Sequence, residues 1–333
     1  MKKLLAALAI GATTVAVRRY LAVRDALASV PAEFRSPLLP LLAVDMTPRS
    51  LGRSRLAYRV RTRPGPGVSL NEHRIDGSLR VLMLAPTLPA GDGRRPGILA
   101  IHGGGMVTGS PQTEVSGNSA LVRELNAVVV SPAYRLAPEH PFPAALDDCM
   151  SALRWILDNA EELGIDPDRI AVTGSSAGGG LSAAVAQRAH DEGIILRAQA
   201  LVYPMLDDRT VLRDASGRGR FLWTPGSNRF GWTAYLGREP RMSDAPEYAA
   251  PARREDLSGL APAWIGVGDL DLFYDESVDY ARRLDAAGVE CELVTVPGMY
   301  HGADGLARKH PSMRAFRRGV VDHLRTHLVS PRS

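Results

Sequence analysis

The pattern of apolar and polar positions along this chain changes at about residue 95. Before that point, three segments alternate apolar and polar side chains, at residues 55–63, 68–75 and 79–85, and we expect a short β-strand in each. Pro64-Gly-Pro-Gly67 and Asp76-Gly77 separate these segments and are typical of turns. The three strands would form the antiparallel beginning of a sheet.

From residue 98 onward, short β-branched runs alternate with longer segments of helical periodicity. The expected strands are 98–102, 127–133, 169–175 and 197–205, and the expected helices are 112–125, 143–163 and 177–190. Alternation of this kind predicts an α/β fold, in which a mostly parallel central sheet is flanked by helices. Functional loops in such a fold follow the carboxyl ends of the strands.

Residues 207–260 interrupt the alternation. They are rich in Arg, Gly, Pro and aromatic residues, and they precede an apolar strand expected at Ala263–Gly268. A loop of this length in a compact domain usually has a function or a structure of its own. We therefore expect an insertion at 207–260 that divides the core into residues 51–206 and 261–333.

The composition argues against several classes of protein and of site. A hydrophobic content of 45% is ample for a globular core, and no apolar run has the length of a transmembrane helix. The formal charge of +4 comes from basic residues scattered among acidic ones, which argues against a nucleic-acid binder. Cys149 and Cys291 form no C-x-x-C pair and predict neither a disulfide framework nor a metal site. No phosphate-cradling loop is apparent, so we expect neither a metal nor a cofactor.

The expected strand 169–175 runs into Gly174-Ser-Ser176-Ala-Gly178, and a helical pattern follows at once. This order is typical of a nucleophile elbow, in which glycines allow a tight turn and expose the central serine. The helix that begins near Ala177 adds free N–H groups and the positive end of its dipole. Ser176 is therefore the candidate nucleophile.

Two further loops support this interpretation. The strand 98–102 ends in His102-Gly103-Gly104-Gly105, and a loop of this type directs N–H groups toward a developing oxyanion. We assign Gly103, Gly104 and Ala177 as the oxyanion donors, and expect His102 to order the loop. Downstream, a strand ends in acidic residues around Asp271, and another ends at His301. The order Ser, Asp, His is that of α/β-hydrolases.

Three aspartates in one loop are candidates for the acid that pairs with His301 and completes the set with Ser176. Asp269 lies at the turn itself and is expected to bond local N–H groups. Asp275 precedes a helical pattern and suits an N-cap. Asp271 lies between them, flanked by Leu270 and Leu272, and is the acid we assign to His301.

Together with the segment Tyr134–Asp148, these motifs resemble those of the hormone-sensitive-lipase-like esterases of the α/β-hydrolase superfamily. The resemblance runs from about residue 95 to the C-terminus and has two departures. Position 175 is Ser where Asp or Glu is frequent, and Leu272 follows Asp271 where Pro is usual. In Tyr134–Asp148 we expect a structural role, with Arg135 paired to Glu139 or Asp147.

The resemblance implies an α/β-hydrolase fold with a helical cap over the active site, built from residues 207–260 and from N-terminal helices within residues 1–50. The N-terminus has other interpretations. Lys2 and Lys3 precede an apolar run from Leu4 to Val17, which resembles a signal peptide without a clear cleavage site. A membrane-surface anchor and a cleaved signal therefore remain open beside the cap helix. A cytoplasmic location is favoured, with membrane association and a homodimer left open.

The residues and the resemblance together predict a serine carboxylesterase that acts on small-molecule esters of short to medium chain length through an acyl-enzyme. An amidase or formamidase on the same three residues is the nearest alternative. A ligand-binding relative without activity is a further one, although related receptors lack the histidine that this chain has at position 301.

Overall fold

The computed structural model describes residues 20–329, except residues 22, 59, 61, 76 and 90–92. Its centre is an eight-stranded sheet in the order β1-β2-β4-β3-β5-β6-β7-β8. The pairs β1–β2 and β2–β4 are antiparallel. The remaining pairs are parallel, so the described chain contains the mostly parallel sheet that the sequence predicted.

The strands are β1 (Val68–Ile75), β2 (Leu79–Pro86), β3 (Arg95–Ile101), β4 (Val128–Pro132), β5 (Ile165–Ser175), β6 (Ala198–Val202), β7 (Ala263–Gly268) and β8 (Cys291–Val296). The main helices beside them are α4 (Pro111–Leu125), α5 (Ala144–Asp158), α6 (Ala177–Asp191), α8 (Tyr274–Ala286) and α10 (Pro311–Leu328). Every strand and helix expected between residues 68 and 205 is present, and each end lies within five residues of its expected position.

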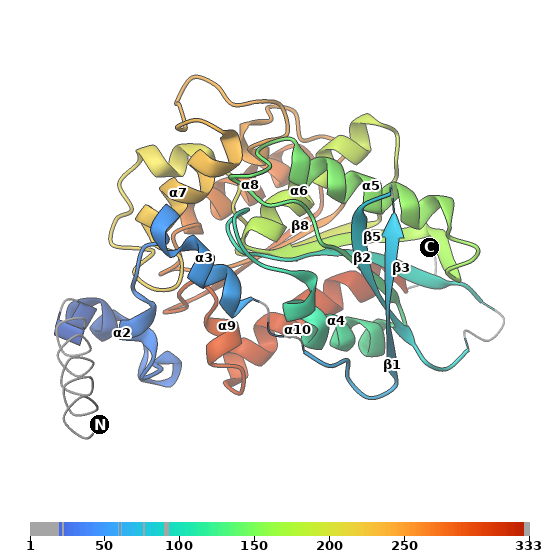
Figure 1. Ribbon diagram of the computed structural model, residues 1–333, viewed down its shortest axis with the longest axis horizontal. Coiled ribbons are helices and arrows are strands. Elements are labelled where there is room, and N and C mark those ends of the chain that lie inside the picture. Colours follow the sequence, from blue (N-terminus) through green and yellow to red (C-terminus); the bar gives the residue numbers. More distant parts are fainter. Residues whose placement is uncertain are drawn as a thin grey trace.

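Helices cover both faces of the sheet, with α4 and α10 on one face and α5, α6 and α8 on the other (Figure 1). Side chains alternate between the two layers along each strand. Leu99 of β3 packs in the cluster with α5 and α6, whereas its neighbour Ile98 packs in the cluster with α4 and α10. Because both faces are covered, the central strands are continuous apolar runs. Each fully buried Leu or Ile stabilises the fold by about 1.5–3 kcal/mol.

The strand expected at residues 55–63 was wrong, because residues Pro48–Ala57 form helix α3. Thr47 begins this helix with a capping box. Its hydroxyl accepts a hydrogen bond from Ser50 N–H (3.2 Å), and Ser50 Oγ accepts one from Thr47 N–H (2.9 Å). Pro48 then occupies the first helical position. β1 is one edge strand of the sheet, and the described residues between α3 and β1 pair with no strand.

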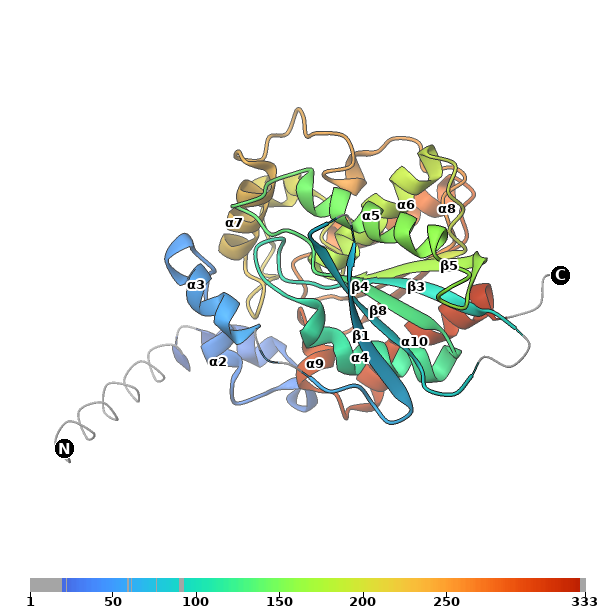
Figure 2. The ribbon, with the colours of Figure 1, turned by 45° about the vertical axis from the view of Figure 1, so that its right-hand side comes forward.

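Two groups of helices lie outside the sheet layers. Before β1 the chain forms η1 (Ala32–Phe34), α2 (Leu39–Leu42) and α3, and within residues 207–260 it forms η2 (Asp208–Leu212), α7 (Pro225–Leu236) and η3 (Pro251–Arg253). Leu51 of α3 and Ala234 of α7 share an apolar cluster with Val107, which lies in the loop after β3 (Figure 2). The two groups therefore meet beside that loop. The alternatives for the N-terminus concern residues 1–30, of which residues 1–19 and 22 lie outside the described residues.

Candidate active site

Ser176 lies in the turn between β5 and α6. Its backbone has φ 57° and ψ −122°, a conformation that residues with a Cβ rarely adopt. A Cβ at Gly174 would lie 2.3 Å from the carbonyl oxygen of Gly178, and one at Gly178 would lie 2.1 Å from that of Ile101. The close approach of these backbones therefore requires glycine at both positions.

His301 and Asp271 lie next to this serine, although 125 residues separate Ser176 from His301 in the sequence. His301 Nε2 is 3.0 Å from Ser176 Oγ, and His301 Nδ1 is 2.8 Å from Asp271 Oδ2. All three side chains are buried, Asp271 completely. Tyr203 and Phe273 hold the imidazole edge-on, with ring centroids 4.6 and 5.3 Å from it. The structure thus brings together the three residues that the sequence proposed for one site.

The three aspartates of the loop after β7 have different partners. Asp271 Oδ1 accepts a hydrogen bond from Phe273 N–H (2.9 Å), which leaves Oδ2 for His301. Asp269 Oδ1 accepts one from Gly298 N–H (2.6 Å), so it ties this loop to the loop of His301 instead of bonding a local turn as expected.

The N-cap role expected for Asp275 was also wrong. Phe273 occupies the N-cap of α8, and Asp275 lies within the first turn, where it pairs with Arg218 (2.7 Å). The side chain of Asp275 is 69% exposed, so this ion pair contributes about 0–1 kcal/mol.

The loop after β3 lies against the serine turn. A Cβ at Gly103 would lie 3.4 Å from the Cβ of Ser176. Gly104 has φ 121°, and its carbonyl oxygen accepts hydrogen bonds from the N–H and the hydroxyl of Thr108 (2.9 and 3.0 Å). Within the described chain, the N–H groups of Gly103, Gly104 and Ala177 have no acceptor. They can therefore donate to a ligand beside Ser176.

His102 orders the glycine loop, as the sequence indicated. Its Nδ1 donates to the carbonyl oxygen of Gly103 (2.8 Å), and its ring stacks on Tyr134 with centroids 4.1 Å apart. The Tyr134 hydroxyl in turn donates to the carbonyl oxygen of His102 (3.0 Å). Burial lowers the pKa of His102 to about 4, and the bond to Gly103 offsets only part of this shift. The imidazole is therefore neutral near pH 7.

The segment 207–260 contacts both the glycine loop and the histidine loop. The indole of Trp223 lies against Gly105, where a Cβ would be 1.9 Å from the ring. Leu222 lies 3.2 Å from the position of a Cβ on Gly302, the residue after His301. Bulky side chains of this segment therefore adjoin the glycine loop and the loop of His301, the two loops that flank Ser176.

Two buried polar residues near the site were not identified from the sequence. Glu276 accepts hydrogen bonds from Leu206 N–H (2.7 Å) and from the Thr210 hydroxyl, and so fixes the beginning of the 207–260 segment to α8. Tyr203 packs on His301 and donates to Asp304 Oδ1 (2.9 Å). Burial raises the pKa of both side chains well above their usual values. The sequence contained no signal for either residue. The strand expected at 197–205 included Tyr203, whereas β6 ends at Val202 and leaves Tyr203 in the loop after it.

The loop Tyr134–Asp148 is held by ion pairs, but not by the expected ones. Arg135 pairs with Asp148 (2.7 Å) instead of Glu139 or Asp147. Glu139 pairs with Arg55 of α3 (2.7 Å), and Asp147 pairs with Arg188 of α6 (2.7 Å). The loop therefore links three helices, which the sequence alone could not reveal because the partners are distant along the chain.

A cavity of about 770 Å³ lies between α4 and α10 on one face of the sheet. Its lining includes Ser175, Tyr203 and Gly302, neighbours of Ser176 and His301. It also includes the apolar side chains of Leu121 and Val320. This volume lies within the range of small-molecule sites, about 300–1,000 Å³.

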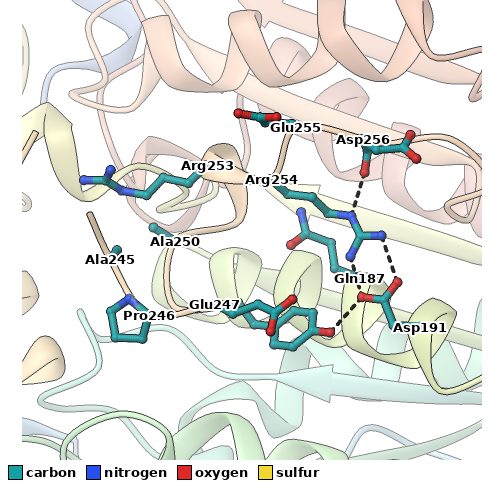
Figure 3. Close-up of a pocket in the computed structure, with 11 residues that line it drawn as sticks. Gln187, Asp191, Ala245, Pro246, Glu247, Ala250, Arg253, Arg254, Glu255 and Asp256 are labelled. Atoms are coloured by element: carbon teal, nitrogen blue, oxygen red, sulfur yellow. Dashed lines mark hydrogen bonds and ion pairs between the residues drawn. The ribbon is translucent and has the colours of Figure 1, made fainter. Parts of the chain in front are cut away.

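A second cavity, of about 550 Å³, lies beside the end of α6 (Figure 3). Arg254 pairs with both oxygens of Asp191 (2.5 and 2.8 Å), and the Tyr248 hydroxyl donates to Asp191 (2.8 Å). The candidate catalytic residues do not line this cavity. Among the described residues, no group of His, Cys, Asp and Glu side chains could hold a metal ion, and no helix could cross a membrane.

Comparisons with known proteins identify the fold family of the chain and its relatives. A family model described as alpha/beta hydrolase fold matches residues 98–304. The carboxylesterase NlhH of Mycobacterium tuberculosis is 41% identical over 215 residues. The matched region covers 62% of this chain and 66% of that relative, which is slightly under two thirds of its length. The carboxylic ester hydrolase LipN of the same species is 36% identical over 80% of this chain and 73% of its own length.

Solved structures extend the similarity to nearly the whole fold. A bacterial heroin esterase superposes with a TM-score of 0.83 at 34% identity and covers 91% of this chain and 99% of its own. The esterase LipW of Mycobacterium marinum superposes with a TM-score of 0.75 at 31% identity. The expected resemblance to esterases and the expected α/β-hydrolase architecture are therefore confirmed.

Proposed function

The chain belongs to the α/β-hydrolase fold family, and from this premise we propose that it hydrolyses carboxylic esters with Ser176, His301 and Asp271. The observation that carries the proposal is the line of contacts from Asp271 Oδ2 to His301 Nδ1 and from His301 Nε2 to Ser176 Oγ, at 2.8 and 3.0 Å. Similar proteins named carboxylesterase or esterase support the ester as the substrate class.

The path of the proton follows from the partners of the two imidazole nitrogens of His301. A carboxylate can only accept a hydrogen bond, so His301 carries its proton on Nδ1 and presents a basic Nε2 to Ser176. As Ser176 Oγ attacks the ester carbonyl, Nε2 takes the hydroxyl proton and then gives it to the leaving alcohol. Asp271 holds the ring in this tautomer and stabilises the imidazolium that forms.

The negative charge that develops on the carbonyl oxygen needs donors in a fixed position. The N–H groups of Gly103, Gly104 and Ala177 are proposed for this role, because they have no other acceptor in the described chain. The acyl group then remains on Ser176 Oγ. Water, deprotonated by His301 Nε2, attacks this acyl-enzyme, and collapse of the second tetrahedral intermediate releases the acid and restores the serine.

We further propose a preference for short to medium acyl chains. Trp223 against Gly105 and Leu222 beside Gly302 place bulky side chains near the reacting serine. The aromatic side chains of the surrounding segment, at Phe221, Trp232 and Tyr235, are themselves buried and form a packed structure. A packed cover of this kind limits the length of the acyl chain that can bind beside Ser176.

An amidase is the second candidate function, because the same three residues can cleave an amide. A panel of p-nitrophenyl esters from acetate to palmitate, with a lactone and an anilide beside them, separates the possibilities. We expect kcat/KM to be higher for the butyrate than for the palmitate ester, measured below aggregation, and slow cleavage of the anilide. Faster cleavage of the palmitate ester would contradict the chain-length proposal. An anilide cleaved faster than every ester would favour the amidase.

A further inference from the structure

Large apolar side chains that face solvent are unevenly distributed over the described chain. Of sixteen such side chains, eight lie within residues 20–60. They are Tyr20, Leu21, Leu38, Leu41, Val44, Leu56, Tyr58 and Val60. The other eight are distributed over the remaining length, to residue 329. Isolated exposed apolar residues are ordinary, whereas a concentration of them marks an interaction surface.

The same part of the chain has an excess of basic residues. Residues 20–60 contain six Arg and three Asp or Glu, a net charge of +3, and residues 1–63 contain twelve Lys or Arg and three Asp or Glu, a net charge of +9. Because the whole chain carries +4, residues 64–333 carry −5. Arg49 and Arg53 of α3 are exposed, and neither pairs with an acidic group in the described chain. The net basic charge of the protein is therefore confined to its first 63 residues.

The segment is fixed to the body of the protein by buried side chains and hydrogen bonds. Phe34 and Leu39 are buried in the cluster that contains α10, and the Tyr300 hydroxyl donates to the carbonyl oxygen of Phe34 (3.0 Å). Arg55 anchors α3 by donating to the carbonyl oxygens of Val107 and Ala137 (both 2.9 Å). The exposed apolar side chains are thus presented from a packed segment, seen at one side of the molecule in Figures 1 and 2.

We propose that residues 20–60 bind the surface of an anionic membrane, with their exposed apolar side chains in the headgroup region. A segment that combines apolar side chains with excess Lys and Arg has the chemistry of an interfacial membrane-binding element. A second copy of the chain is a poorer partner for this face, because residues 20–60 carry a net charge of +3 and two such segments repel each other.

The segment that bears this surface contacts the loop of the candidate active-site histidine. Pro31 packs on Gly298, and Phe34 accepts the bond from Tyr300, the residue before His301. Membrane binding through residues 20–60 would therefore bring the catalytic end of the protein to the lipid surface. The binding itself does not depend on the proposed esterase activity, and the two are tested by different measurements.

The test is co-sedimentation of the full chain with vesicles of phosphatidylcholine alone and with about 30% phosphatidylglycerol added. We expect binding to the anionic vesicles, weakened by about 0.5 M NaCl. Leu38→Asp with Leu41→Asp should reduce the bound fraction about tenfold. Leu56→Asp with Val60→Asp should also reduce it. Ile195→Asp is the matched control, because Ile195 is even more exposed than the substituted residues but lies outside the segment, and it should bind like the wild type.

Hydrolysis of a water-soluble p-nitrophenyl ester without vesicles should be unchanged in all these variants, which shows that they are folded. Wild-type protein that stays in the supernatant with both kinds of vesicle would overturn the proposal. Undiminished vesicle binding by both double variants would also overturn the proposal, because another part of the chain would then be responsible for the binding. A concentration-dependent dimer without lipid that Leu38→Asp with Leu41→Asp abolishes would assign the surface to a second copy instead.

Discussion

Asp271 and Asp269 lie two residues apart, yet only Asp271 contacts His301. We expect Asp271→Asn to preserve the fold and to lower kcat by roughly 10⁴-fold, because the amide favours the wrong histidine tautomer. Steady-state kinetics on a p-nitrophenyl ester measure this loss. Asp269→Asn is the control, since an amide oxygen can still accept the bond from Gly298 N–H. Near-normal kcat in Asp271→Asn, together with a loss in Asp269→Asn, would refute the assignment.

Two buried histidines, His102 and His323, make the free energy of unfolding depend on pH. Burial lowers the pKa of His102 from 6.5 to about 4. The unfolded chain therefore binds a proton at higher pH than the folded one, and stability is lost as pH falls from 6.5 to about 4. His323, also buried, has its pKa lowered to about 4 and acts in the same direction. Each contributes on the order of 3 kcal/mol across this window.

Urea unfolding at pH 7 and pH 4.5 tests this dependence. We expect His102→Gln to lose less stability over this interval than the wild type. Glu139 and Asp191 do not obscure the comparison, because their ion pairs with arginine lower their pKa values to about 2 and their contribution is lost only at lower pH. An equal loss in variant and wild type would show that His102 is not responsible.

At the scale of elements, Arg55 supplies the ion pair that attaches helix α3 to the Tyr134–Asp148 loop, beside the apolar packing of Leu51. Arg55 donates to two carbonyl oxygens and forms a two-point ion pair with Glu139. We expect Arg55→Met to destabilise this contact by about 2 kcal/mol and to speed hydrogen exchange of the α3 amides. Arg53→Met is the control, because Arg53 lies on the same helix, is exposed and forms no ion pair within the described chain. Equal exchange in both variants would contradict this role of Arg55.

The elements that the sequence predicted well are those in which apolar periodicity and burial agree. Strand β7 occurs at the expected residues because Ala263–Gly268 is buried on both faces. The failure at residues 55–63 has the opposite cause. Alternation there suggested a strand, but the Thr47 capping box and Pro48 begin a helix that extends to Ala57. Local capping decided the structure because no neighbouring strand was available to pair with that segment.

At the scale of the whole molecule, the order of the motifs was predictable but their contacts were not. Chain order placed Ser176, Asp271 and His301 at the ends of strands that a parallel sheet gathers at one edge. The partners of Arg135, Asp147 and Glu139 depend instead on how helices pack, which periodicity does not encode. The division of the chain into a core and caps at residues 1–50 and 207–260 remains a proposal, supported by the contact of α3 with α7.

The central claim is that Ser176 is the residue that carries the acyl group. Ser175 is a matched control, because it precedes Ser176 in the same turn but lines the cavity between α4 and α10. The most direct measurement is the mass of the peptide labelled by a fluorophosphonate in wild type, Ser176→Ala and Ser175→Ala. We predict one label on Ser176 in the wild type and in Ser175→Ala, and neither label nor turnover in Ser176→Ala. A label that persists in Ser176→Ala and disappears in Ser175→Ala would contradict the account.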